Sequence, residues 1–141
     1  MQLSNELGDT KQVNDIVLRS SDGTASLTLE SLKPGVSGGA EFTFVVSSRG
    51  FAARSWYALE AEELAALIAD LERMYESLSG TAEIRLHMEE EHVSFFIEPT
   101  GRLLVRGVII HYEEPLHRLE FGFYSDQSCL PEFVRRLSGK Q

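Results

Sequence analysis

Residues 59–80 read LEAEELAALIADLERMYESLSG, the one long stretch in which apolar residues recur at helical spacing. Acidic residues at positions 60, 62 and 63 suit the N-terminal end of a helix dipole, and Gly80 can take the left-handed conformation that ends a helix. The stripe must be buried against the strand-like stretches on either side. Its residues lie three and four apart: Leu64, Leu67, Ile68, Leu71, Met74, Tyr75 and Leu78.

The flanking stretches alternate apolar and polar residues, as half-buried strands do. Before the helix we expect strands over residues 15–19, 24–32, 41–47 and 51–58, joined as hairpins. After it we expect strands over 81–88, 92–98 and 102–112 and a last one around Phe121, followed by a helix within 126–137. We expect an α+β fold of about eight mainly antiparallel strands in β-hairpins with two helices, in the order ββββα-ββββα.

Three local details follow from the same pattern. For both apolar sets to face one side, even-numbered residues of 81–88 must pair with odd-numbered residues of 92–98. Residues 102–112 are apolar on both faces, which predicts an internal strand with Gly107 as a bulge or a site of close approach. Ser128 is the expected N-cap of the last helix, in preference to Asp126, because Pro131 then falls in the first turn.

Length and composition restrict the class of protein. The 141 residues predict a single domain over 1–141, with residues 1–13 as a loose N-terminal segment or an added edge strand. Thirteen basic against 22 acidic residues give a net charge of −9, which argues against a nucleic-acid binder. No apolar run is long enough for a membrane span, no export signal is evident, and one cysteine fits a reducing compartment, so we expect a cytoplasmic protein.

Histidine and glutamate residues near two expected turns raise the question of a metal site. His87 and His92 bracket three glutamates, and His111 and His117 flank a later turn. In the expected register His87 and His92 do not face each other, and no metal-binding motif on a helix is present. We therefore expect neither a metal nor a cofactor.

Two other features could carry chemistry. Residues 35–39, GVSGG, match the formal pattern of a hydrolase nucleophile elbow, but a strand follows them where that motif needs a helix. Cys129 is expected at the first position of the last helix, where it is either a small half-buried filler or a reactive thiol. No histidine lies close in sequence to act as its base, and we expect no catalytic residue.

The acidic residues have two interpretations, a solvated surface or a patch that attracts a basic protein partner. The densest acidic run lies at a hairpin turn, and a second acidic pair lies at the next turn but one. An exposed tryptophan at a strand would add an aromatic contact, although a core position is the alternative. The candidate partner-binding residues are Glu89, Glu90, Glu91, Glu113, Glu114 and Trp56.

Residues 119–137, LEFGFYSDQSCLPEFVRRL, form an apolar strand, a DQS turn and a helix with a Leu-x-x-Phe pattern. This ending resembles that of the WapI family of bacterial immunity proteins. The Leu78-Ser79-Gly80 helix end and the strand between Gly101 and Gly107 follow in the order seen in that family, so the resemblance covers about residues 40–137. It implies a cytoplasmic, non-enzymatic protein that neutralises a toxin domain, and implies that Asp126 and Gln127 organise the strand-to-helix turn.

Function is therefore interpreted as a non-catalytic acidic protein-binding module, an immunity protein whose partner is a basic cognate toxin domain. Two alternatives stay open. The chain could bind a small molecule or act as a small enzyme through a pocket between sheet and helix. It could instead be a structural homo-oligomer, such as a homodimer, that buries Trp56 and the outer strand face.

Overall fold

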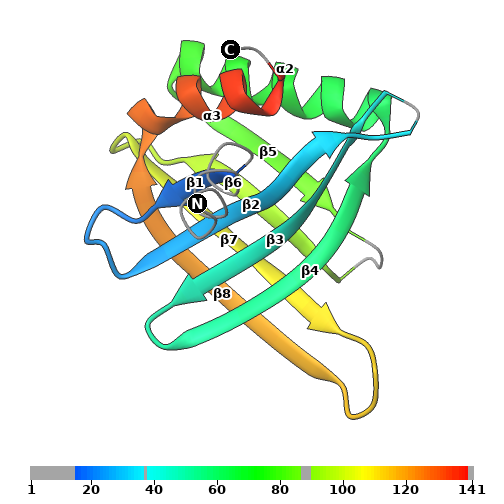
Figure 1. Cartoon of the computed structure of the whole chain (residues 1–141). Helices are drawn as coiled ribbons and strands as arrows, with labels where there is room; N and C mark the ends of the chain where they lie inside the picture. The colour runs from blue at the N-terminus through cyan, green and yellow to red at the C-terminus, as the bar shows by residue number, and fades with distance from the viewer. Residues whose placement is uncertain (1–14, 37, 87–89, 140–141) are drawn as a thin grey trace, which may run out of the picture.

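The computed structural model describes residues 15–36, 38–86 and 90–139. The N-terminal segment 1–13, Ser37 of the GVSGG motif, His87 and Glu89 lie outside the described residues. The elements follow the expected order (Figure 1): β1 (Ile16–Arg19), β2 (Ala25–Pro34), β3 (Ala40–Ser48), β4 (Phe51–Leu59), α2 (Ala61–Ser77), β5 (Gly80–Arg85), β6 (His92–Ile97), β7 (Arg102–His111), β8 (His117–Asp126), the 3₁₀ turn η1 (Gln127–Cys129) and α3 (Leu130–Leu137).

The described strands form two antiparallel four-stranded sheets. The first sheet has the order β1-β2-β3-β4 and the second has the order β5-β6-β7-β8, so each strand pairs with its neighbour in sequence. This arrangement confirms the predicted α+β fold of hairpins with a helix after each group of four strands. Sequential hairpins of this kind need only short connections, which is why turn residues separate the strands so regularly.

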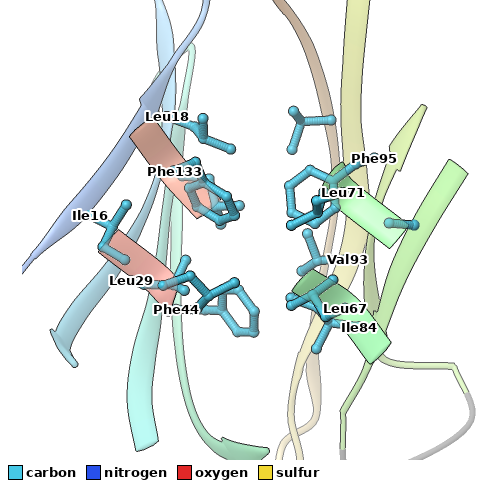
Figure 2. Packing of buried hydrophobic residues seen from close by; sticks show 14 of the residues in the cluster. Ile16, Leu18, Leu29, Phe44, Leu67, Leu71, Ile84, Val93, Phe95 and Phe133 are labelled. Atoms are coloured by element: carbon cyan, nitrogen blue, oxygen red, sulfur yellow. The ribbon is translucent and has the colours of Figure 1, made fainter. Parts of the chain in front are cut away.

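The apolar faces of the two sheets point toward each other and form one core. Ala25, Leu27 and Leu29 are buried on the same face of β2, as the alternation predicts. Both helices contribute to the same cluster of buried residues, so the core is shared by both sheets and both helices. Figure 2 shows side chains of both sheets and both helices converging: Ile16, Leu18, Leu29, Phe44, Leu67, Leu71, Ile84, Val93, Phe95 and Phe133.

Helix α2 lies along one end of the sheets with α3 beside it (Figure 1). Its N-terminus is a capping box, in which the Glu60 side chain accepts from the backbone of residue 63 and Glu63 Oε1 accepts from Glu60 N at 2.9 Å. Leu67, Leu71 and Met74 are buried as predicted.

Two details of the predicted α2 stripe are wrong. Tyr75 and Leu78 are exposed. The face of α2 that packs against the core is narrower than the apolar stripe in the sequence, and its buried residues are Leu67, Leu71 and Met74. The C-cap of α2 is Leu78, with a φ of 55°, whereas Gly80, which also has the positive φ expected of it (103°), already begins β5. The chain turns away from the helix two residues earlier than the position of the glycine suggests.

The last helix also begins differently from the prediction. Asp126 Oδ1 accepts from Ser128 N at 2.8 Å, so Asp126 caps η1, and Cys129 is the N-cap of α3. The prediction of Ser128 as the cap was wrong because the short 3₁₀ turn adds residues that still leave Pro131 within the first turn of α3. Neither α2 nor α3, the α helices of the described residues, is long and apolar enough to cross a membrane.

The register of the second sheet confirms the parity argument. Ala82 pairs with Phe95 and Ile84 pairs with Val93, even with odd, and all four are buried. Strand β7 is internal, between β6 and β8.

Gly107 is a site of close approach between backbones, which is one of the two roles predicted for it; the other was a bulge. It pairs directly with Val93 and Phe121, and a Cβ atom at this position would lie 2.2 Å from the backbone oxygen of His92. Gly122, on the neighbouring strand β8, has room, because its nearest neighbour would be the Arg106 Cβ at 3.4 Å. Only the first glycine is therefore required by the packing of backbones.

We expect Gly107→Ala to lower the free energy of unfolding by about 3 kcal/mol, because the clash is with backbone that cannot move independently. The matched control Gly122→Ala should change it by less than about 0.5 kcal/mol. Urea unfolding followed by circular dichroism measures both values. Equal effects of the two substitutions would contradict this explanation.

The β1–β2 turn is stabilised by one carboxylate. Asp22 Oδ1 accepts from Thr24 Oγ1 at 2.7 Å, from Thr24 N at 3.0 Å and from Ser20 Oγ at 2.8 Å. These hydrogen bonds lower the pKa of Asp22 from 3.8 to about 2. The ionised form is therefore favoured by folding.

Asp22→Asn should lower the melting temperature at pH 6, where the wild-type carboxylate is ionised in both states and its stabilising bonds are present. Because the pKa of Asp22 is lower in the folded chain, this contribution is lost as the pH falls from about 4 toward about 2. Thermal unfolding at several pH values should show the difference between the two proteins closing over this range. A difference in melting temperature that does not change with pH would rule out a stabilising role for the ionised Asp22 carboxylate.

Candidate partner-binding surface

Two turns of the second sheet lie at the same end, opposite the connections to α2 and α3. In this antiparallel order, the turn between β5 and β6 and the turn between β7 and β8 must share one end. Glu90 Oε1 accepts from Arg118 Nη1 at 2.9 Å, which joins the first turn to the base of the second. Glu90, Glu113 and Glu114 are all exposed at this end.

Glu91 does not belong to this exposed group. Its side chain is fully buried, with an exposed fraction of 0%, whereas the sequence interpretation placed it on a solvated acidic turn. It lies two residues before Val93 and therefore points to the same inner face as Val93, Phe95 and Ile97. Extending the alternation of β6 backward would have predicted this orientation.

The tip of the β7–β8 hairpin also carries apolar side chains that sequence reasoning missed. Tyr112 is 42% exposed and Leu116 is 60% exposed, on either side of Glu113 and Glu114. The only available signal was their position beside a turn, outside the alternating part of each strand. The hairpin end therefore combines exposed aromatic and aliphatic side chains, which are typical of interface centres, with carboxylates, which are typical of the polar rim.

The pKa of Tyr112 is raised from its usual value of 10, first by desolvation and then by the negative charges of Glu91 and Glu90. The phenol therefore stays protonated at neutral pH and can donate a hydrogen bond from an apolar ring. His111 and His117 face each other across the same hairpin, with ring centroids 6.3 Å apart, and His111 Nε2 lies 4.0 Å from Glu113 Oε1.

Trp56 lies apart from this group, on the outer face of the first sheet. It is 54% exposed and pairs with Thr43 across β3 and β4. Its neighbour Ser55 points the opposite way, toward the interior, where its hydroxyl contacts Glu91. The exposed position agrees with the interpretation of Trp56 as a surface aromatic, and its role in binding a partner stays a prediction.

Of the residues considered for chemistry, the structure shows the surroundings of His92 and Cys129. His92 Nδ1 lies 3.0 Å from the backbone oxygen of Glu90, and no group of three metal-binding side chains converges among these residues. Cys129 is half-buried, and desolvation raises the pKa of its thiol. A thiol with a raised pKa is less reactive at neutral pH, which favours the filler interpretation.

A hollow of about 590 Å³ lies between β2, α2 and the end of α3, where the pocket alternative would place a ligand. Its basic lining residues are engaged with protein atoms. Lys33 Nζ lies 3.8 Å from Glu41 Oε1, and Arg136 Nη2 donates to Asp15 O at 2.6 Å. The contacts of Lys33 and Arg136 do not indicate which kind of ligand the hollow would bind.

Comparison with known families identifies the class of protein. Residues 39–139 match a family described as "Immunity protein WapI-like family", and immunity proteins act in general by neutralising toxins. The match spans more than two thirds of the chain, and the chain belongs to the WapI-like family of immunity proteins. This finding confirms the resemblance drawn from residues 40–137. Members of such a family are in general not enzymes. The curated proteins contain no match to this chain.

Proposed function

We propose that this chain neutralises a basic toxin domain by binding it through the exposed end of the second sheet. The residues of this hairpin end are Glu90, Tyr112, Glu113, Glu114 and Leu116. The observation that carries the proposal is the presence of exposed carboxylates and exposed apolar side chains together on one projecting hairpin.

Charge supports a basic partner. The net charge of −9 gives the whole molecule a negative field, which attracts a cationic protein and speeds its association. A toxin that acts on a nucleic acid needs a basic surface to bind phosphates, and an acidic protein can occupy that surface. The single cysteine, a free thiol, fits an encounter in the cytoplasm.

The shape of the fold also supports the hairpin end as the binding site. In Figure 1 the β7–β8 hairpin extends at the bottom of the view, beyond the strands of the first sheet, while α2 and α3 lie at the top. A projecting hairpin can enter a concave surface such as an active-site cleft. Tyr112 and Leu116 would then supply buried anchor contacts, surrounded by the carboxylates.

Helix α2 offers a rival acidic surface and a matched control. Residues 60–77 contain six acidic residues and one arginine, and Glu72 and Glu76 are exposed. These residues are at the helical end of the molecule, away from the hairpin end (Figure 1). Charge reversal at the two places changes the net charge equally, so any difference in effect reports the location of the partner.

The first test is charge reversal at the hairpin end. Glu113→Lys/Glu114→Lys should slow association with the toxin domain at low salt by about tenfold or more, because it places two cations against a basic partner. The probe is a purified toxin domain whose toxicity is suppressed when this chain is expressed with it. Stopped-flow fluorescence at low and at physiological salt measures the rate.

The control variant Glu72→Lys/Glu76→Lys has the same net charge and should slow association by less than about threefold. A larger effect of the control than of the hairpin variant would move the interface to α2 and overturn the proposal. Equal effects would show that only the overall charge matters.

The second test removes an apolar anchor. Tyr112→Ala should speed dissociation of the complex by about tenfold to a hundredfold, with little change in the association rate, because the exposed part of the ring would be buried only in the bound state. Tyr124→Ala is the control, since Tyr124 is a similarly exposed tyrosine on the outer face of β8. Surface plasmon resonance measures both rates. Unchanged dissociation of the Tyr112 variant would exclude it from the interface.

A further inference from the structure

The buried carboxylate of Glu91 joins the two sheets at the base of the projecting hairpin. Glu91 Oε2 accepts from Ser55 Oγ of β4 at 3.1 Å and from Ile110 N of β7 at 3.0 Å. Strand β4 belongs to the first sheet and β7 to the second, and Glu91 itself lies just before β6. One side chain therefore connects three segments that are distant in sequence.

The sheet geometry explains why a side chain is needed at this place. Strand β6 pairs with β7 only from Leu103 to Val108, because β6 begins at His92. Strand β7 continues to His111, so the amide of Ile110 lies beyond the last residue of its neighbouring strand. The Glu91 carboxylate supplies the acceptor that a longer β6 would have supplied.

The carboxylate carries a cost as well as a benefit here. Glu91 Oε1 is buried and has no hydrogen-bond partner among the described residues, which is a cost for a charged group. An apolar side chain of similar size would remove this cost but would leave the Ile110 N–H and the Ser55 hydroxyl without this acceptor. What a carboxylate adds is direction, because its two bonds to Oε2 specify how β4 and the hairpin are placed relative to each other.

We infer that Glu91 is a positioning residue that clamps the β7–β8 hairpin to β4 and holds the hairpin end in its binding orientation. This inference rests on the proposed function for the purpose of the clamp, but the clamp itself can be measured without a partner. Tyr112, the proposed anchor, lies two residues beyond Ile110 and is followed by Glu113 and Glu114. Loss of the clamp would therefore increase the motion of the segment that carries these three side chains. Holding this segment in place before binding lowers the entropic cost of forming the complex.

Amide hydrogen exchange of the full chain, measured by NMR, tests the clamp. In Glu91→Leu, which keeps the size and removes both bonds, exchange at Ile110 N–H should rise by about tenfold or more, while amides of β2 and β3 stay within about twofold. Glu91→Gln keeps an acceptor oxygen and should stay near the wild type. Ser55→Ala removes only the bond to β4 and should raise exchange at Ile110 by about threefold.

The control for a lost serine hydroxyl is Ser94→Ala, since Ser94 Oγ donates to Arg106 O within the second sheet, away from the clamp. It should leave Ile110 exchange unchanged. Unchanged exchange at Ile110 in Glu91→Leu, or an equal rise in β2 and β3, would overturn the inference, the latter because it indicates general destabilisation.

Binding of the toxin domain then tests the purpose of the clamp. Glu91→Leu should weaken affinity by about tenfold and Glu91→Gln by less than about threefold. If the Glu113→Lys/Glu114→Lys variant weakens binding and Glu91→Leu does not, the hairpin surface is correct and the positioning role is wrong. If neither variant weakens binding, the proposed function fails, and the exchange experiment still decides whether the clamp exists.

Discussion

Burial of the two inner sheet faces against each other is the constraint on which the rest of the structure depends. A four-stranded sheet with residues such as Leu27 and Phe44 on one face cannot leave that face in water, and the second sheet has the same need through Val93 and Phe95. Neither sheet covers the other completely. Helices α2 and α3 supply the remaining apolar side chains at one end, and all four parts share one core.

Polar contacts also join the two sheets along their edges. At the β1–β8 side, Ser125 Oγ donates to Arg19 O at 2.6 Å and Ser21 N donates to Tyr124 O at 2.9 Å, which joins the edges of the two sheets. At the β4–β7 side the corresponding connection is the Glu91 carboxylate. The chain belongs to the WapI-like immunity family, whose members act in general by neutralising toxins.

The candidate surface was only partly predictable. Acidic turn residues can be found by inspection, and Glu90, Glu113 and Glu114 are exposed at a common end, as the hairpin order implies. Tyr112 and Leu116 were missed because apolar residues beside a turn look like the ends of buried strands. Glu91 was misplaced because a charged residue in an acidic run is expected in water, although the alternation of β6 extended backward points it inward; its contacts with Ser55 and Ile110 came only from the tertiary structure.

The sequence alone determined the elements, their order, the buried faces and the family. Alternation and helical spacing are local consequences of backbone geometry. The inward orientation of a residue such as Leu71 or Phe95 can therefore be predicted without knowing which residues it contacts. The tertiary structure decided which ends meet, where α2 stops packing and how Asp126 and Cys129 share the start of the last helix. These features depend on distances between segments far apart in the chain, as between Ser55 and Glu91, and no local pattern encodes such distances.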